Sequence, residues 1–422
     1  MPKRNITIIS SSPFPYGDNI TDGPGFRAWV LFQELAKRHD VTILSLYESY
    51  HQTLSKEYDV SENSILVKCI SHKPRRVARA ITEEKPDVLY MPWSATPFIS
   101  HLKARIPTVI DYVGPGLLEN FASLGYIPAH LLRLKLHSFW LGDFLMTAGY
   151  RERYYLLGLF VASKRLSLNV QKVASPFIHV IPMTPPPEPP VMRKKIINRE
   201  LDELIILLAG TFLPYYDYST FFDAFKLLIR RGKTNFKIVI AGGNPRDLKF
   251  EETVRKMGQS LPKENVVFTG LVPFKERANL YLGADAGMNI SPATLEDELS
   301  VRTRVIDYLW GRLPLITPAR DEHSEMVTRH GAGFTYEVEN PQSLAQVIEM
   351  LIEPSGRKKL KQARDNIEKL LKDHLNIINF IGPLEDFLNN PYVDPARLST
   401  KQILPDIFLL ARDTFRHLRR GI

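Results

Sequence analysis

The chain is poor in cysteine and has no long apolar run. Cys69 is the single cysteine among 422 residues, so no disulfide can form within the chain, as is usual in a reducing compartment. No apolar run approaches the roughly 18 residues that a membrane-spanning helix requires. The apolar stretch near the N-terminus, Ile6 to Ile9, is too short for the core of a signal peptide. These absences predict a cytoplasmic protein.

The chain also lacks the usual metal-binding patterns. It contains no Asp-x-Asp pair and no cluster of histidine and cysteine at ligand spacing. We therefore expect neither a required metal nor a cofactor. No signature of an RNA- or DNA-binding module is present, which makes nucleic acid the weaker partner. The net charge of +9 then indicates an anionic partner, such as a membrane face, or a basic surface that only solvent covers.

What the chain does contain is a repeated alternation of strands and helices. Its hydrophobic content of 44% and charged content of 24% are typical of a globular protein. Strands predicted from Asn5 to Ser10 and from Val41 to Leu46 flank a helix that begins at Gly23. A second alternation starts with a strand from Leu204 to Ala209. Each half is therefore expected to be an α/β domain with a parallel sheet.

The proline-rich segment from Pro182 to Pro190 separates the two halves, because it cannot be helical and is expected to be stiff. We predict an N-terminal Rossmann-like domain, a linker, a C-terminal Rossmann-like domain and a helical tail, with the bounds 1–181, 182–200, 201–375 and 376–422. Within the tail, Ile407 to Arg420 has one apolar and one arginine-rich face. Such a helix can pack on the N-terminal domain or lie on an anionic membrane.

The hexapeptide Gly23 to Ala28 fits the Gly-x-Gly-x-x-Gly/Ala pattern of dinucleotide-binding turns. That pattern places its first glycine at the end of a strand, whereas Gly23 lies well beyond Ser10. We interpret the hexapeptide as a hinged loop in which Gly25 allows close backbone approach to a ligand. Arg27, at the start of a helix, would then attract phosphate. The alternative is a flexible surface turn with Arg27 in water.

Asp111 ends a strand predicted from Pro107. Ligands of doubly wound sheets bind beyond the carboxyl ends of the strands, so Asp111 is a candidate catalytic residue, or else a helix cap. The following stretch, Leu117 to Leu141, mixes large apolar residues with basic ones. It predicts a core helix with one solvated face, or a helix that touches a membrane.

The stretch from Asn289 to Pro318 carries most of the candidate site residues. Ser300 can cap a helix that begins near Val301. The amides at a helix start attract phosphate. Arg302 and Arg304 add forked guanidinium groups that suit phosphate oxygens. The stretch therefore predicts an anion site.

Carboxylates flank this predicted helix. Glu296 and Glu298 stand just before it and suit the hydroxyl groups of a sugar, and Asp307, two turns into it, suits a ribose. Gly210 and Thr211, at the end of the first strand of the second half, add a turn to the same site. An ordinary strand–loop–helix unit with a charged surface loop is the alternative.

This stretch resembles the donor-binding segment of retaining GT-B glycosyltransferases in family 4, which act on lipids and polysaccharides. Those proteins carry Glu-x7-Glu followed by Ala-Met-Ala-x-Gly-x-Pro. Asp307, seven residues before Pro314, falls on the second glutamate. The eighth residue before Asp307 is Leu299, so the first glutamate is displaced to Glu298 or Glu296. The sequences Ser-x-Arg-Thr-Arg and Asp-Tyr-Leu-Trp resemble one subgroup.

The resemblance implies two facing Rossmann-like domains with the ligand between them and a last helix that returns to the N-terminal domain. It implies transfer of a sugar from a nucleotide diphosphate to an acceptor hydroxyl, with retention. A lipid-linked or cell-surface glycan at the inner membrane face is the expected acceptor. The diphosphate is expected to contact Arg302, Arg304, Arg27 and the Ser300 amide region. Asp307 is expected to bind the ribose, and Glu298 or Glu296 the sugar.

Three other functions stay open. The wider family has Gly-Arg and a following lysine where this chain has Gly210-Thr211 and then Asp217. The loss of those cations keeps open a degenerate GT-B subunit that binds a partner without turnover. A nucleotide-sugar epimerase would need an acid–base set that the sequence does not offer. A dehydrogenase would rest on Gly23 to Ala28 alone.

Overall fold

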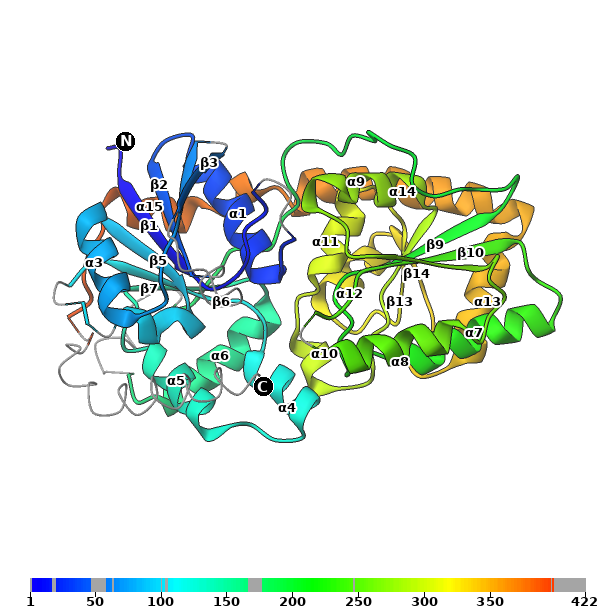
Figure 1. Ribbon diagram of the computed structural model, residues 1–422, viewed down its shortest axis with the longest axis horizontal. Helices are drawn as coiled ribbons and strands as arrows, with labels where there is room; N and C mark the ends of the chain where they lie inside the picture. Colours follow the sequence, from blue (N-terminus) through cyan, green and yellow to red (C-terminus); the bar gives the residue numbers. More distant parts are fainter. Residues whose placement is uncertain are drawn as a thin grey trace. The chain divides into compact units, whose positions relative to one another are not determined.

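The computed structural model divides the chain into two compact units, one of residues 1–182 with 377–422 and one of residues 183–376 (Figure 1). The residues that it describes are 2–16, 20–46, 58–62, 64–99, 101–102, 105–165, 177–245, 247–395 and 397. The first unit ends at Pro182, where the proline-rich segment begins. Each unit is an α/β sandwich built on its own sheet.

The N-terminal unit contains an eight-stranded sheet in the order β3-β4-β2-β1-β5-β6-β7-β8. All neighbours pair in parallel except the β3–β4 pair. Its strands are β1 (Asn5–Ser10), β2 (Asp40–Ser45), β3 (Tyr58–Glu62), β4 (Ile65–Cys69), β5 (Val88–Pro92), β6 (Thr108–Tyr112), β7 (Phe144–Thr147) and β8 (His179–Val180). The predicted strand from Asn5 to Ser10 is thus confirmed, and β3 and β4 were missed.

The helices of this unit are α1 (Gly23–Leu35), α3 (Pro74–Glu84), η1 (Trp93–Ile99), α4 (Gly116–Leu124), α5 (Ala129–Ser138), α6 (Tyr150–Ala162), η4 (Ile377–Asn379) and α15 (Gly382–Asn389). The single helix predicted from Leu117 to Leu141 is wrong. Gly125 adopts φ +77°, which ends α4, and Pro128 begins the next helix. The structure therefore has two helices, α4 and α5, where one helix was expected.

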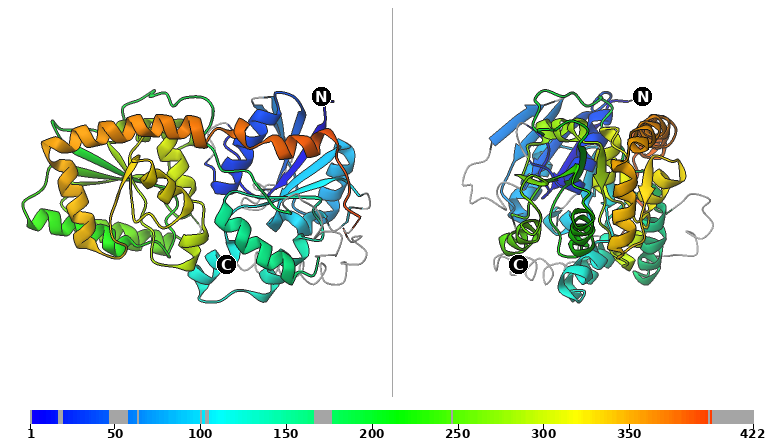
Figure 2. Two further views of the ribbon diagram at one scale, coloured as in Figure 1. Left: turned by 180° about the vertical axis from the view of Figure 1, so that it is seen from behind. Right: turned by 90° about the vertical axis from the view of Figure 1, so that its right-hand side faces the viewer.

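The last described helix belongs to the N-terminal unit. The segment after α14 returns to the first unit, where α15 lies (Figure 2). Residues of α15 join the core formed by α1 and the first strands, and the ring of Phe387 lies 5.3 Å from that of Phe144. Arg4 also donates to the carbonyl oxygen of Leu388 at 2.9 Å. The chain thus returns to its first unit after completing the second, as the resemblance implied. The amphipathic stretch from Ile407 to Arg420 lies outside the described residues.

The C-terminal unit contains a six-stranded parallel sheet in the order β11-β10-β9-β12-β13-β14. Its strands are β9 (Leu204–Ala209), β10 (Phe236–Ala241), β11 (Val266–Gly270), β12 (Ala286–Met288), β13 (Leu315–Thr317) and β14 (Gly333–Thr335). The chain order reverses between β9 and β12. The carboxyl ends of these two strands therefore form the switch point at which such sheets bind ligands.

Helices cover both faces of this sheet, with α9 and α14 on the opposite side from α7 and α8 (Figure 1). They are α7 (Tyr218–Arg230), α8 (Leu248–Gly258), η3 (Phe274–Glu276), α9 (Arg277–Gly283), α10 (Leu295–Leu299), α11 (Thr303–Trp310), α12 (Glu322–Arg329), α13 (Pro341–Ile352) and α14 (Pro354–His374). Aromatic side chains of α7, including Phe221, Phe222 and Phe225, fill one face. In the described parts of both units, no helix has the length and apolar character to cross a bilayer.

Candidate functional site

The switch point of the C-terminal sheet is lined by turns that need glycine. Gly210, directly after β9, adopts φ +119°, and Gly242, directly after β10, adopts φ +145°. A Cβ atom on Gly242 would lie 2.0 Å from the carbonyl oxygen of Gly210. The two strand ends therefore approach each other more closely than any side chain would allow. This packing fixes the backbone of Gly210 and Thr211 at the end of β9.

Arg304 lies against this glycine turn. It extends from the first turn of α11, and a Cβ atom on Gly210 would lie 3.4 Å from its guanidinium. The guanidinium faces the ring of Tyr216 at 4.3 Å and is 3.5 Å from the carbonyl oxygen of Thr211. The residue is only 9% exposed, yet no carboxylate among the described residues pairs with it. A buried cation without a counter-ion favours an anionic ligand at this place.

Arg302, predicted to hold phosphate, is instead neutralised by its own loop. Its guanidinium donates to Glu296 at 2.7 and 3.1 Å and to Asp297 at 2.8 and 3.2 Å. All three residues are buried, and burial, opposed by Arg302, raises the pKa of Asp297 to about 6. The prediction of a phosphate contact at Arg302 is therefore corrected. Arg302 joins α10 to the start of α11 and so positions Arg304.

The prediction that Ser300 caps a helix from Val301 is also wrong. Two helices occupy this region, and Thr294 caps the first of them through the Asp297 amide at 3.2 Å. Ser300 follows α10, and its hydroxyl donates to the Glu296 carbonyl oxygen at 2.6 Å and lies 2.7 Å from its carboxylate. Its side chain thus supports the Arg302 cluster and caps no helix.

The structure separates the two glutamates that the sequence could not distinguish. Glu296 is buried and bonded to Arg302 and Ser300, so its carboxylate has no room for a sugar. Glu298 lies on the same short helix but is 55% exposed, with its carboxylate 3.8 Å from Arg320. Of the two, Glu298 alone can reach a ligand in solvent.

Asp307, the predicted ribose ligand, is held by residues of α9. The hydroxyl of Tyr281 donates to it at 3.1 Å, and the guanidinium of Arg277 lies 3.4 Å away. Arg277 in turn packs on the ring of Trp310 at 4.3 Å. Burial raises the pKa of the Asp307 carboxyl, and Arg277 opposes that rise. The ribose role stays a prediction, and Arg277 and Tyr281 are partners that the sequence had not indicated.

Tyr308 anchors α11 to the switch point. Its hydroxyl accepts the Ala209 amide at 2.9 Å and lies 3.1 Å from the carbonyl oxygen of Met288 and 3.2 Å from that of Leu207. Gly287 makes room for the ring, since a Cβ atom there would lie 2.6 Å from it. Tyr308 thus links β9, β12 and α11 through one buried group. In the sequence, Tyr308 stands among mostly apolar residues, and nothing there indicates this role.

We expect Tyr308→Phe to lower the free energy of unfolding by about 1–3 kcal/mol, because the buried Ala209 amide loses its acceptor. Urea denaturation of the two proteins measures this change. Tyr126→Phe is the control, because Tyr126 is exposed and its hydroxyl makes no bond among the described residues. Equal stability of Tyr308→Phe and the parent chain would show that the hydroxyl does not anchor α11.

A buried polar network fixes the end of β12. The Asn289 side-chain amide lies 3.1 to 3.4 Å from the side-chain oxygens of Ser291, Thr317, Asp321 and Ser324. The Tyr336 hydroxyl donates to the Asn289 carbonyl oxygen at 3.2 Å. Such a network holds the loop that leads to α10 in one conformation. The sequence analysis placed Asn289 at the start of its segment but assigned it no role.

In the N-terminal unit, Arg27 and Asp111 meet in the interior. The Arg27 guanidinium donates to Asp111 at 2.8 Å and to the Ile181 carbonyl oxygen at 2.6 Å. The Tyr90 hydroxyl also donates to Asp111. Arg27 is 3% exposed and Asp111 is 1% exposed. Because neither group reaches the surface, the predictions of a phosphate contact for Arg27 and a catalytic role for Asp111 are corrected to a structural pair.

Gly25 is likewise needed for internal packing. It lies inside α1, and a Cβ atom there would be 2.1 Å from the carbonyl oxygen of Pro13. The Asp22 carboxylate caps the helix by accepting the Gly25 amide at 2.9 Å. The close backbone approach that the sequence predicted at Gly25 is therefore to the chain itself and not to a ligand.

Lys135, expected on a helix with a solvated face, is fully buried. Its ammonium group lies 4.1 Å from the ring centre of Trp93 and 5.2 Å from that of Tyr112. Burial lowers the pKa of Lys135 to about 7, although nearby carboxylates, led by Glu119, oppose the shift. Helix α5 thus packs on Trp93 and Tyr112 through a buried cation and not through leucines alone.

One comparison with known proteins covers the segment that carries the C-terminal site. Residues 203–354 match the family model of glycosyl transferases group 1. This segment contains Gly210, Thr211, Glu298, Arg304 and Asp307, and the match supports a glycosyltransferase. None of the curated proteins matches the chain.

Solved structures show the fold of the whole chain. The Anabaena protein HepE, in complex with UDP and glucose, has a TM-score of 0.65 at 13% identity, over 92% of this chain and 99% of that chain. Sucrose-phosphate synthase from Thermosynechococcus elongatus has a TM-score of 0.67 at 14% identity, over 92% and 100%. WaaG, a glycosyltransferase of lipopolysaccharide biosynthesis, has a TM-score of 0.59 at 13% identity, over 91% and 100%. The chain has the GT-B fold.

Proposed function

We propose that the protein transfers a sugar from a nucleotide diphosphate to an acceptor hydroxyl, with retention of the anomeric configuration. The observation that carries the proposal is Arg304, a buried guanidinium that no carboxylate in the described residues pairs with, at the switch point of a segment that matches glycosyl transferases group 1. A departing diphosphate gains negative charge in the transition state. A cation fixed beforehand at that place stabilises it without reorganisation.

The remaining residues of the switch point support this assignment. The turn at Gly210 and Thr211 leaves backbone groups beside Arg304, where the phosphates would lie. Glu298, the exposed carboxylate before α11, would bind the sugar hydroxyls, and Asp307 would bind the ribose. In this proposal, catalysis is positional and electrostatic, and no covalent intermediate is needed.

Thermal unfolding with a panel of nucleotide sugars tests the proposal. A donor present at a hundredfold excess over its dissociation constant stabilises the folded chain by about 2.7 kcal/mol. We expect one donor to raise the melting temperature and to be slowly hydrolysed when no acceptor is present. The anomer of the released sugar, read by NMR, then tests retention. Binding without release would favour a partner-binding subunit, and the absence of any shift would contradict the donor site.

We further propose that the acceptor is a lipid-linked or cell-surface glycan and that the protein meets an anionic membrane. The segment from α4 to α5 supports this, because it exposes Phe121 by 53%, Leu124 by 43% and Tyr126 by 58%, and it also exposes Arg133. Apolar side chains together with cations favour the surface of an anionic bilayer.

We therefore expect the protein to sediment with vesicles of phosphatidylglycerol and to be released at high salt. Phe121→Ser combined with Tyr126→Ser should abolish sedimentation, because the segment from α4 to α5 loses these two exposed rings. Leu201→Ser is the control, since Leu201 is 90% exposed but belongs to the C-terminal unit. Complete recovery of the parent protein in the supernatant would contradict membrane contact.

Turnover is expected to need no metal, because Arg304 offers the charge that a divalent cation would otherwise supply. In the described residues, no group of three histidine, cysteine or acidic side chains lies close enough to hold an ion. Donor hydrolysis measured before and after dialysis against EDTA should therefore give the same rate. A loss of rate that Mg²⁺ or Mn²⁺ restores would contradict this expectation.

A further inference from the structure

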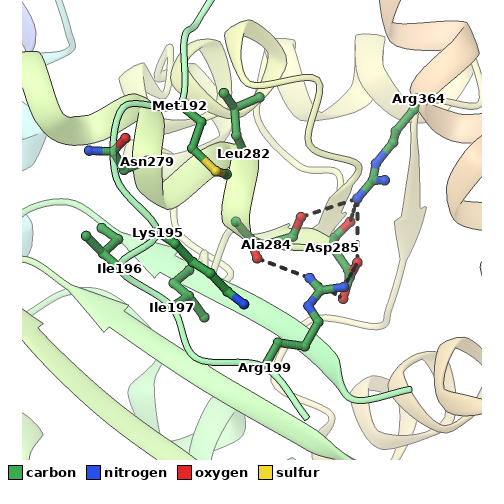
Figure 3. A pocket seen from close by; sticks show the side chains of 11 residues that line it. Met192, Lys195, Ile196, Ile197, Arg199, Asn279, Leu282, Ala284, Asp285 and Arg364 are labelled. Carbon is green, nitrogen blue, oxygen red and sulfur yellow. Dashed lines mark hydrogen bonds and ion pairs between the residues drawn. The ribbon is translucent and has the colours of Figure 1, made fainter. Parts of the chain in front are cut away.

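A cavity of about 270 Å³ lies in the C-terminal unit, at the amino ends of the central strands (Figure 3). Its lining comes from the segment 192–199, from α9, from the residues before β12 and from α14. Asp285 directly precedes β12, whereas Asn289 directly follows it. Because β9 and β12 are parallel, this cavity and the switch point that holds Arg304 lie at opposite ends of these strands.

The cavity has an excess of positive charge. Lys195, Arg199 and Arg364 line it together with one carboxylate, Asp285, an excess of two positive charges. Arg199 and Arg364 reach Asp285 from opposite sides, with closest approaches of 3.1 and 3.6 Å (Figure 3). Arg357, which does not line the cavity, lies 3.2 Å from the same carboxylate. Three guanidinium groups therefore share one acidic side chain.

Nothing else in the described residues balances this charge. One nitrogen of Arg199 also donates to the carbonyl oxygen of Gly283 at 3.1 Å, and one nitrogen of Arg364 to that of Ala284 at 3.2 Å. Lys195 has no hydrogen bond or ion pair there. Burial lowers the pKa of Arg364, Asp285 opposes this, and the two neighbouring arginines lower it further. The cavity is thus an electropositive site with donors to spare.

Apart from Asn279, the rest of the lining is apolar. Met192, Ile197 and Leu282 contribute side chains to the same cavity, and we refer to these three as its apolar wall. A bare inorganic anion would leave this wall in contact with water. A molecule with one anionic end and one compact apolar end would use both parts of the lining.

We propose that this cavity binds a small phosphate monoester. Its phosphoryl group contacts Lys195, Arg199 and Arg364. The two guanidinium groups and the ammonium group donate hydrogen bonds to its three terminal oxygens. Its organic part lies against the apolar wall. The site is separate from the donor site and depends on a different set of cations, so its occupancy does not require that the proposed transferase activity is correct.

Calorimetric titration of the full chain with phenyl phosphate tests this proposal. We expect one bound molecule per chain, held more tightly than inorganic phosphate because of the apolar wall. Lys195→Gln should weaken binding by roughly tenfold, as expected for one lost charged hydrogen bond. Since Lys195 has no partner in the described residues, this variant does not disturb the fold. Arg364→Gln should weaken binding at least as much.

Three controls identify the site. Lys194→Gln removes a neighbouring exposed lysine that does not line the cavity, and it should bind phenyl phosphate like the parent chain. Arg304→Gln removes the donor-site cation and should also bind normally. Met192→Ala should weaken binding of phenyl phosphate but not of inorganic phosphate. Unchanged binding in Lys195→Gln and Arg364→Gln, or its loss in Arg304→Gln, would overturn the proposal.

Discussion

Arg304→Ala is expected to lower kcat/KM for the nucleotide-sugar donor by about 10²–10³-fold, as does the loss of one preorganised group from a developing oxyanion in other enzymes. The reason is the position of the guanidinium, which is 9% exposed, faces Tyr216 and has no carboxylate partner in the described residues. The effect should be present in donor hydrolysis and in transfer, because both break the same bond. Initial rates at several donor concentrations measure it.

Two further variants make this result specific. Arg304→Lys should recover only part of the loss, since one ammonium group cannot replace a planar fork of donors. Arg231→Ala is the matched control, because Arg231 is 40% exposed at the end of α7 and pairs with Glu349 at 3.2 Å. Equal kcat/KM for Arg304→Ala and Arg231→Ala would contradict a diphosphate site at the switch point.

The sequence predicted several strands because each is a short, mostly apolar run. β1 and β9 have the predicted bounds, and β2 begins and ends one residue before the predicted strand. It missed β3 and β4, which form an antiparallel pair at one edge of the N-terminal sheet. β4 alternates buried and half-buried residues over only five positions, too short a pattern to separate a strand from a loop.

Site residues were harder to assign, because a sequence shows which charges are near in the chain and not which are paired in space. Arg302 and Arg304 stand two positions apart and looked equivalent as phosphate ligands. The structure distinguishes them, since Glu296 and Asp297 neutralise Arg302 while Arg304 turns toward Gly210. Arg27 and Asp111 are 84 positions apart, so their pairing was not predictable from spacing.

Arg27→Met is expected to lower the free energy of unfolding by about 3–5 kcal/mol, because it leaves Asp111 as a buried carboxylate without its cation. Both groups are almost completely buried, so solvent does not screen their attraction. Tyr90 still donates to Asp111, but a single hydroxyl cannot replace an ion pair and two backbone contacts. Urea denaturation measures the loss. Arg79→Met, which removes an exposed partner of Glu83, should have no measurable effect.

The double variant Arg27→Met with Asp111→Asn decides between a structural and a catalytic pair. If the cost of Arg27→Met comes from an uncompensated carboxylate, neutralising Asp111 should recover a large part of the lost stability. The folded double variant should then bind donor with the affinity of the parent chain, because neither side chain reaches the surface. A double variant that regains stability but loses donor binding would instead indicate that Arg27 binds the diphosphate, as its position at a helix start first suggested.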